Sequence, residues 1–578
     1  MLVYGDRVRR TTTADQAERL VAALAEVGCR PSGLENHARL TTAFITAGEL
    51  FQGIADAEFE AAGCDDQSPA QGAAMTILVE LGRALGRSWD SDFRATGAPH
   101  LAALADLPRQ APQGITCRLA EGYAYYAVYP EAYYQVAREM AWTPPLRILG
   151  LRNIGASLSA MVAASLDAEP PATVRPVGHP FERRLALSAR LRQNLSPTPG
   201  LRYVVVDEGP GLSGSSFAAA DEALGELGAN PDQVIFLPSH GGQPGAACTQ
   251  ARRERWSRSR RHFLDFDALC LSPATPPARR LDTWVEGVVG PLEAPLRDIS
   301  AGVWRAVKAV SAPAIPALER RKFIAVSERG EWLVKFAGLG ASGEDRLARA
   351  TALSAAGFIP PVAGLRHGFL VETWLGRAGT PDFARLDRSA LLARLANYIG
   401  FRARAFPALA EEGADLAQLV RMAQVNLVEA LGPVHAAGPL ARLANAAARR
   451  PASRAVHIDG RMHAWEWLAP PDGRLLKADA LDHSCQHDLI GCQDPAWDVV
   501  GAAIELGLSS AETEDLAARV GRQCNRRLDP DLLDAFFVCY PAFQIGLWSL
   551  PGAEGAQALR ARYRRALLEP ALPEEITP

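Results

Sequence analysis

A short apolar strand, two adjacent carboxylates and a small-residue loop follow one another in residues 203–217, which read Tyr-Val-Val-Val-Asp-Glu-Gly-Pro-Gly-Leu-Ser-Gly-Ser-Ser-Phe. The residues up to 227 then favour a helix. At the C-terminal end of a parallel strand, such a loop directs free backbone N–H groups and a helix N-terminus toward an anion. The carboxylates of Asp207 and Glu208 can accept hydrogen bonds from vicinal hydroxyls or hold a divalent cation. The stretch therefore predicts a ligand that is both a phosphate and a polyol, such as a phosphorylated ribose, with an ordinary βα turn as the alternative.

This stretch resembles the phosphoribosyl pyrophosphate signature of the type I phosphoribosyltransferases, in which a hydrophobic strand and two acids precede a phosphate loop. The resemblance makes Asp207 and Glu208 catalytic residues that contact the ribose hydroxyls. It assigns the 5′-phosphate to the loop residues Ser213, Gly214, Ser215 and Ser216. The loop is one residue longer than in the family, and Gly-Pro-Gly at 209–211 replaces the usual aliphatic pair.

A second strand–turn–helix unit precedes the first one in the chain. Residues 146–151 read as a buried strand, residues 152–157 as a polar turn, and the residues after them as an apolar helix. In the same family, the first strand–loop–helix unit of the core supplies the pyrophosphate contacts. The resemblance therefore assigns phosphate binding to the turn residues Arg152, Asn153, Gly155 and Ser157.

The C-terminal half contains a second set of polar residues in a recognisable order. Residues 322–326 and 332–336 read as a hairpin whose second strand carries Lys335, and a helix with Glu344 near its start follows. Downstream, residues 457–463 read His-Ile-Asp-Gly-Arg-Met-His, residues 475–483 read Leu-Leu-Lys-Ala-Asp-Ala-Leu-Asp-His, and residues 493–498 read Gln-Asp-Pro-Ala-Trp-Asp.

This order resembles the aminoglycoside phosphotransferase and choline kinase branch of the protein-kinase-like fold. The resemblance implies a bilobal domain that binds ATP and Mg²⁺, and it gives each polar residue a role. Lys335 would contact the ATP phosphates with Glu344 as its partner, Asp459 would be the catalytic base, and Asp479 or Asp482 would hold the metal. The family's metal-binding Asn is Ala464 here, so His463 or Glu466 would have to replace it, and the phosphate-covering loop is not glycine-rich.

The length and composition limit what else the chain can be. A chain of 578 residues predicts about three domains, and 48% apolar with 22% charged residues is ordinary for a globular protein. A net charge of −4 gives no electrostatic footprint for nucleic acid. No 18-residue apolar run or signal-peptide core is present, so no membrane partner is expected. Nine scattered cysteines indicate reduced thiols in a cytoplasmic protein. We expect small-molecule substrates, and the sequence leaves a homo-oligomer open.

The predicted fold class is a multidomain α/β and α+β protein. Residues 1–115 read as a helical cap or interaction domain, and residues 116–272 as a phosphoribosyltransferase-like domain with a parallel sheet. Residues 273–300 read as a Pro-rich linker, and residues 301–578 as the bilobal kinase-like domain. Six tyrosines between residues 123 and 134 predict a packing face, or alternatively a stacking platform for an aromatic acceptor.

The predicted function combines these parts. The first domain would be a phosphoribosyltransferase that uses phosphoribosyl pyrophosphate and Mg²⁺ on a small acceptor that the sequence does not identify. The kinase-like domain would bind ATP and phosphorylate the product. The alternative is a non-catalytic regulator that senses nucleotide and phosphoribosyl pyrophosphate, with a pseudokinase-like C-terminal domain.

Overall fold

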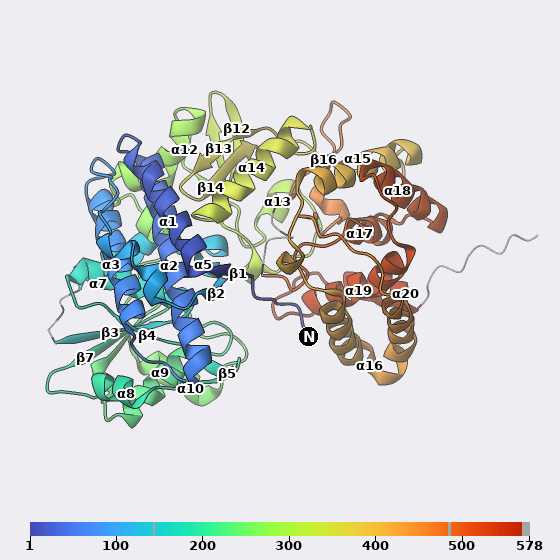
Figure 1. Ribbon diagram of the computed structural model, residues 1–578. Helices are drawn as coiled ribbons and strands as arrows, with labels where there is room; N and C mark the ends of the chain where they lie inside the picture. The colour runs from blue at the N-terminus through green and yellow to red at the C-terminus, as the bar shows by residue number, and fades with distance from the viewer. Residues whose placement is uncertain (141, 143–144, 482, 484–486, 569–578) are drawn as a thin grey trace, which may run out of the picture.

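The computed structural model describes residues 1–140, 142, 145–481, 483 and 487–568. Two sheets and a helical lobe organise these residues (Figure 1). A parallel sheet covered by helices takes the N-terminal part, an antiparallel sheet follows it in the chain, and the helices of residues 388–568 form the last part. Among the described residues, no helix combines the length and apolar character that a membrane crossing requires.

The parallel sheet has the strand order β4-β3-β7-β8-β9. Its strands are β3 (Leu146–Leu151), β4 (Ala172–Val174), β7 (Arg202–Val206), β8 (Val234–Leu237) and β9 (Arg260–Arg261). The chain leaves β3 toward β4 on one side and returns to β7 on the other. The order therefore reverses between β3 and β7, and in open parallel sheets this switch point is where ligands bind.

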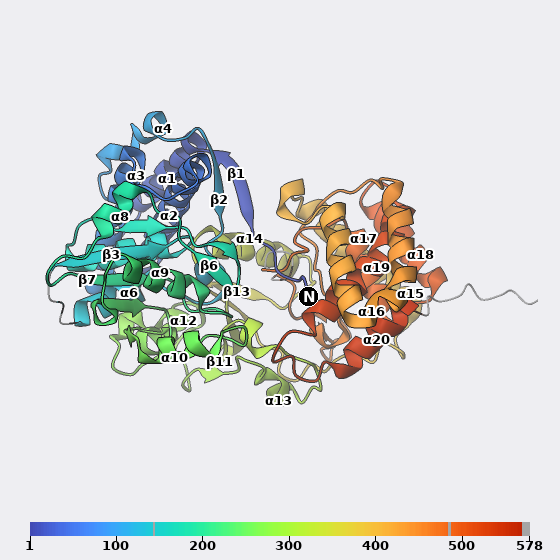
Figure 2. The same ribbon diagram turned by 90° about the horizontal axis from the view of Figure 1, so that it is seen from below.

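Helices cover both faces of this sheet, which explains its continuous apolar strands. Along β7, Val204 and Val206 join the core beneath the N-terminal helices, whereas Tyr203 and Val205 join a smaller core on the opposite face. The first face holds α1 (Thr13–Gly28), α2 (Leu34–Ala62), α3 (Pro69–Asp90), α6 (Pro130–Glu139) and α7 (Gly155–Leu166). The second face, which is seen from below in Figure 2, holds α8 (Ala189–Leu195), α9 (Ser215–Glu226) and α10 (Gln250–Arg258).

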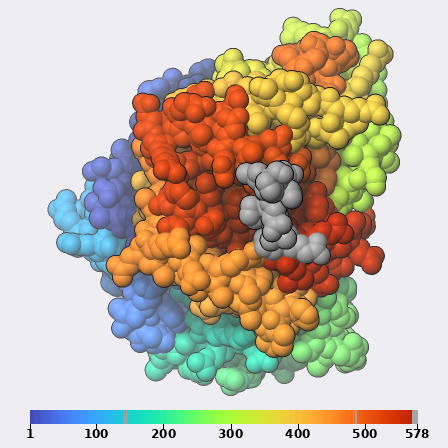
Figure 3. All heavy atoms as spheres, turned by 90° about the vertical axis from the view of Figure 1, so that its right-hand side faces the viewer, coloured from blue at the N-terminus to red at the C-terminus, as the bar shows by residue number. Residues whose placement is uncertain are grey.

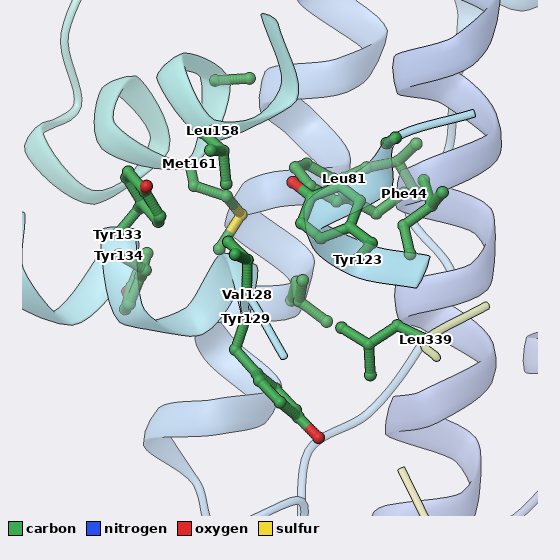
Figure 4. Close-up of a cluster of buried hydrophobic side chains, with 14 of the residues drawn as sticks. Phe44, Leu81, Tyr123, Val128, Tyr129, Tyr133, Tyr134, Leu158, Met161 and Leu339 are labelled. Atoms are coloured by element: carbon green, nitrogen blue, oxygen red, sulfur yellow. The ribbon is translucent and has the colours of Figure 1, made fainter. Parts of the chain in front are cut away.

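The helices of residues 1–115 share their core with the parallel sheet and have no core of their own. Phe44 of α2 and Leu81 of α3 lie beside Leu158 and Met161 of α7 (Figure 4). The short strands β1 (Val8–Thr12) and β2 (Gly114–Arg118) pair to close this layer. The first five residues lie outside this layer and contact the helical lobe. Val3 packs in the core of that lobe, and its carbonyl accepts a hydrogen bond from the Leu489 N–H at 2.9 Å.

Four of the six tyrosines pack in this first core, as the packing interpretation predicts. Figure 4 shows these four, Tyr123, Tyr129, Tyr133 and Tyr134, among the apolar side chains. Tyr125 is buried but does not belong to this core, and Tyr126 is 39% exposed. The cluster comes from α5 (Glu121–Tyr125), from α6 and from the turn between the two helices.

The antiparallel sheet has the order β10-β11-β12-β14-β13. Its strands are β10 (Arg297–Asp298), β11 (Lys322–Ser327), β12 (Gly330–Phe336), β13 (Val362–Arg366) and β14 (Phe369–Thr373), and α14 (Ala341–Ala355) packs on it. Because side chains alternate along a strand, Val334 and Phe336 enter the first core while Lys335 faces away from it. The sheet thus has one face on the N-terminal part and the other on a cleft.

Residues 273–300 pack against this structure instead of forming a free linker. Helix α12 (Leu281–Val289) buries Trp284 and Val285 in the first core, and β10 pairs with β11. The Pro-rich composition at 273–277 accounts for a break between helices but not for a mobile connection.

The helical lobe completes the described chain, and Figure 3 views it face on. It contains α15 (Arg388–Ala405), α16 (Leu416–Ala448), α17 (Ala496–Leu506), α18 (Ser510–Gln523), α19 (Pro530–Leu547) and α20 (Gln557–Leu568), with a small hairpin of β15 (Trp467–Leu468) and β16 (Leu476–Lys477). Helix α16 is kinked at Gly432, whose φ is 76°. After this hairpin, residues 478–481 return to the cleft beside the antiparallel sheet.

Candidate functional site

A cleft between the antiparallel sheet and the helical lobe brings together two of the residues predicted for the kinase-like site. Lys335 comes from β12 and Asp479 follows β16, and Lys335 Nζ donates to Asp479 Oδ1 at 2.6 Å. The cavity around this ion pair is lined by Leu333, Glu372, Trp374, Leu468, Trp304, Lys308, Ile315, Leu318 and Lys322. Burial raises the pKa of Asp479, but the charge of Lys335 outweighs it and holds that pKa well below its ordinary value.

Asp459 lies deeper in the same region, in a loop that α17 holds in place. Asp498 at the start of α17 accepts hydrogen bonds from the backbone N–H groups of Asp459 and Gly460, at 2.8 and 2.9 Å. Gly460 has a φ of 83°, a left-handed conformation that favours glycine. Tyr398 OH donates to Asp459 Oδ2 at 2.5 Å. Burial and the charge of Asp459 raise the pKa of Asp498 to about 6.

A buried lysine joins Asp459 to Glu466. Lys477 Nζ lies 3.2 Å from Asp459 Oδ1 and 2.7 Å from Glu466 Oε2. His483 is beside them, with Nδ1 3.8 Å from Asp459 Oδ1 and Nε2 3.8 Å from Asp479 Oδ2. The donor atoms of Asp459, Glu466 and His483 all lie within 4.8 Å of one another, which suits a cation. The ammonium group of Lys477 therefore lies where the carboxylates would otherwise need a metal ion.

Glu344 does not lie with Lys335, contrary to the sequence prediction. Its exposed side chain accepts a hydrogen bond from Thr42 of α2 at 3.3 Å, and it lines a different cavity. On the sheet, the acidic residue that lines the cleft near Lys335 is Glu372, a buried residue of β14 that pairs with Leu333 and so lies on the same face. The sequence contains one indication of this role, because Glu372 is a charged residue that directly follows the apolar run Phe-Leu-Val of a predicted strand. Asp482, the other predicted metal ligand, lies outside the described residues.

The acidic pair predicted to bind ribose lies at the carboxyl end of β7, at the switch point of the parallel sheet. Asp207 Oδ1 accepts the Glu208 N–H at 2.9 Å, and the Asp207 carbonyl accepts a hydrogen bond from Tyr133 OH at 2.8 Å. A Cβ placed on Gly122 would lie 2.8 Å from Glu208 Oε2, so the carboxylate fits closely against α5. Burial raises the pKa of Asp207 to about 7 and, together with the charges of Glu121 and Asp207, that of Glu208 to about 8.

The loop after the acidic pair leads into α9, as the strand–loop–helix pattern predicts. Gly214 has a φ of 67° and precedes the first helical residue, Ser215. The hydroxyls of Ser213 and Ser215 both donate to the carbonyl of Pro180, at 3.2 and 2.8 Å, and lie 2.9 Å from each other. Ser216 is half-buried in the first turn of α9. A phosphate at this loop would therefore meet the N-terminus of α9, while the hydroxyls of Ser213 and Ser215 would have to leave Pro180 to contact it.

In the turn at residues 152–157, which was predicted to bind pyrophosphate, two of the four predicted side chains have partners inside the protein. Arg152 is fully buried, and its guanidinium pairs with Asp56 at 2.9 Å and with Asp65, so its prediction as a phosphate ligand is not supported. Ser157 is also buried, and its hydroxyl donates to the Ile154 carbonyl at 2.9 Å. The physical reason is that the N-terminal helical layer covers this part of the sheet and supplies internal partners.

The two other residues of that turn lie close to the switch point. The Asn153 side chain donates to the Leu119 carbonyl at 2.8 Å. A Cβ placed on Gly155 would lie 2.5 Å from the Val206 carbonyl, so only glycine allows α7 to begin so near the end of β7.

Comparison with known proteins gives structural matches only. No family model and no curated protein matches the sequence. About half of the chain aligns with solved choline kinase and aminoglycoside phosphotransferase structures. A choline kinase from Streptococcus pneumoniae aligns over 43% of this chain and 89% of its own, with 14% identity and a TM-score of 0.29. A spectinomycin phosphotransferase with bound ADP and spectinomycin aligns over 51% and 94%, with 12% identity and a TM-score of 0.33. An aminoglycoside phosphotransferase with ADP and hygromycin B aligns over 51% and 99%, with 13% identity and a TM-score of 0.30.

Proposed function

We propose that the cleft between the antiparallel sheet and the helical lobe binds a magnesium nucleotide. The observation that carries this proposal is the Lys335–Asp479 ion pair, whose members are 144 positions apart in the chain and meet at 2.6 Å inside one cavity. A nucleotide would separate the pair, with Lys335 contacting the phosphates and Asp479 holding Mg²⁺. The apolar residues Leu333, Trp374 and Leu468 on the cavity walls offer surfaces for a purine base.

The distribution of lysine supports the same site. The chain has four lysines among its 61 basic residues, and all four lie at this cleft. Lys308, Lys322 and Lys335 line the cavity, and Lys477 Nζ lies 3.4 Å from the Asp479 carbonyl. Lysine offers a compact charge on a flexible stem, which suits phosphate binding. At all other Lys/Arg positions of the chain the residue is arginine.

Phosphoryl transfer itself would be slow at this site. A catalytic base must accept a proton from the substrate hydroxyl, but Asp459 already has the Lys477 ammonium and the Tyr398 hydroxyl as partners. Although burial alone would raise the pKa of Asp459, the charge of Lys477 and the hydrogen bond of His483 lower it. We therefore favour nucleotide binding with little transfer, which corresponds to the regulatory alternative for this half of the chain.

The test is covalent labelling with an acyl phosphate of ATP, which transfers its acyl group to a lysine amine near the bound phosphates and releases ATP. We expect the full-length chain to be labelled at Lys335 and excess ATP with Mg²⁺ to suppress the labelling. Labelling that ATP does not suppress, or that occurs at the N-terminal amine alone, would show that the cleft does not bind the nucleotide.

A second ligand site, for phosphoribosyl pyrophosphate with Mg²⁺, is proposed at the end of β7. The observation that favours it is the position of Asp207 and Glu208 at the switch point, directly before a loop that opens α9. Carboxyl groups with pKa values raised to about 7 and 8 are poorly solvated, and hydroxyl groups or a cation would stabilise their charged forms. Release of pyrophosphate from labelled phosphoribosyl pyrophosphate, with a panel of nitrogenous bases as acceptors, tests whether this site also transfers the ribose.

A further inference from the structure

Two histidines and a glutamate from distant segments meet in the first core. His37 lies in α2, Glu131 lies in α6, and His367 lies in the turn between β13 and β14. His37 Nε2 is 2.9 Å from Glu131 Oε1, and His367 Nε2 is 3.6 Å from the same oxygen. All three side chains are fully buried. Polar groups placed this deeply must have strong partners to offset the loss of water.

His37 has a polar neighbour at each ring nitrogen. Nδ1 lies 2.9 Å from the hydroxyl of Ser88, which lies 2.6 Å from the hydroxyl of Thr96. A serine hydroxyl can accept as well as donate, so Ser88 can accept a hydrogen bond from Nδ1 of the neutral ring. In that tautomer the lone pair of Nε2 faces Glu131 Oε1, 2.9 Å away, and is available to a cation.

A proton on His37 would satisfy only part of this cluster. Among the described residues, neither ring nitrogen of His367 has a hydrogen-bond partner, and Glu131 Oε2 has none either. The donor atoms of the three residues lie within 4.8 Å of one another. Ligand atoms of a tetrahedral zinc ion at about 2.0–2.2 Å are separated by roughly 3.3–3.6 Å. The two histidine Nε2 atoms lie 2.9 and 3.6 Å from Glu131 Oε1, which is close to that separation.

We propose that His37, Glu131 and His367 bind a divalent transition-metal ion of the zinc type. Two imidazole nitrogens and a carboxylate are a ligand set that zinc uses, and the unpartnered Glu131 Oε2 can complete four donor atoms by bidentate binding. Ser88 orients His37 through the ring nitrogen that does not face the metal.

The role of the ion would be structural, because the site is closed to solvent. It would join the N-terminal helices α2 and α6 to the antiparallel sheet of the nucleotide cleft. His367 has a φ of 39°, a conformation that costs free energy for a residue other than glycine. Its carbonyl accepts a hydrogen bond from Tyr129 OH at 2.6 Å. Ligation of the ring and this hydrogen bond together would hold the turn in that conformation.

The first experiment measures the metal in the wild-type chain. The full-length protein is expressed with zinc in the medium, purified without chelator, and examined by mass spectrometry of the elements and by X-ray absorption at the zinc edge. We expect about one zinc per chain, bound by nitrogen and oxygen with two imidazoles and no sulfur. A folded chain that contains no bound zinc, or zinc ligated by sulfur, would overturn the proposal.

The second experiment uses Glu131→Gln, which keeps the shape of the side chain and can still hydrogen-bond to both histidines. We expect this variant, checked for folding by circular dichroism, to lose the zinc. His483→Gln is the matched control, because it removes a ligand from the other candidate cluster, and it should retain the zinc. Zinc that persists in folded Glu131→Gln, or that is lost from His483→Gln, would assign the metal elsewhere. If Glu131→Gln does not fold, the X-ray absorption spectrum of the wild-type protein still tests the proposal, because it shows whether the zinc has two imidazole ligands and no sulfur.

Discussion

The Nζ atom of Lys477 lies 3.2 Å from Oδ1 of Asp459, and neither side chain is exposed to solvent. Our proposal of nucleotide binding with little phosphoryl transfer rests on this pair. In an active site, the base must be free to accept a proton, and metal ions neutralise the surrounding carboxylates. Here a permanent ammonium group serves that neutralising function for both Asp459 and Glu466. Loss of Lys477 would therefore leave two buried carboxylates without their neutralising ammonium group.

The first prediction concerns the loss of this ammonium group. Lys477→Met should lower the free energy of unfolding by about 3–5 kcal/mol, because it leaves buried carboxylates without their partner. Added Mg²⁺ should restore part of that loss by binding to Asp459 and Glu466, and thermal melts with and without Mg²⁺ measure both effects. A second change, Glu466→Gln, removes one of the unpaired charges and should recover some stability. Equal melting temperatures for Lys477→Met and the wild type would contradict the buried ion pair.

The second prediction concerns nucleotide affinity. Lys335→Ala should weaken Mg²⁺-dependent ATP binding by about 10-fold to 100-fold, which corresponds to the loss of one charge-assisted contact of about 1.5–3 kcal/mol. Calorimetric titration of the full-length chain gives the affinity. Arg329→Ala is the matched control, because Arg329 lies at the exposed turn of the same hairpin. An equal loss in both variants would mean that the hairpin was disturbed and that Lys335 makes no specific contact.

Local sequence patterns predicted the strands and the ends of strands well. The buried runs at 146–151 and 203–206 form β3 and β7, and Lys335 lies on a strand that faces the cleft. Short-range rules suffice there, because burial and alternation are properties of a few neighbouring residues.

Partners from distant segments could not be predicted in the same way. Arg152 pairs with Asp56 and Asp65, which lie 96 and 87 positions away. Glu372, and not Glu344, shares the cleft with Lys335 because strand register, which sequence spacing does not reveal, decides which carboxylate arrives there. The docking of residues 1–5 on the helical lobe has the same origin, since it depends on a surface formed by residues beyond position 420.

The third prediction concerns the acidic pair at the end of β7. Replacing Asp207 by Asn and Glu208 by Gln should keep the fold, because the volumes are unchanged, yet weaken phosphoribosyl pyrophosphate binding. The expected loss is about 2–4 kcal/mol, the range for two charge-assisted contacts to ribose hydroxyls or to Mg²⁺. Calorimetric titration with Mg²⁺ present measures it. An unchanged affinity in the double variant would remove these residues from the ligand site.

The last prediction follows from the raised pKa values of the same pair. Burial raises the pKa of Asp207 to about 7 and that of Glu208 to about 8, whereas in the unfolded chain both lie at about 4. Between about pH 4 and pH 8 the folded protein therefore holds protons that the unfolded chain has released. The free energy of unfolding must then fall as the pH rises through this interval.

This fall in stability with rising pH can be tested by melting temperatures measured from pH 5 to pH 8.5. The wild type is compared with the Asp207→Asn, Glu208→Gln double variant. The neutral amides cannot release a proton, so the double variant should gain stability relative to the wild type as the pH rises. Glu222→Gln, an exposed change on α9, controls for the loss of negative charge and should follow the wild-type curve. Phosphoribosyl pyrophosphate binding should show the opposite dependence, because the ionised carboxylates are the forms that bind hydroxyls and Mg²⁺. Parallel melting curves for the wild type and the double variant would mean that the two carboxyl groups titrate normally and are not poised to receive a ligand.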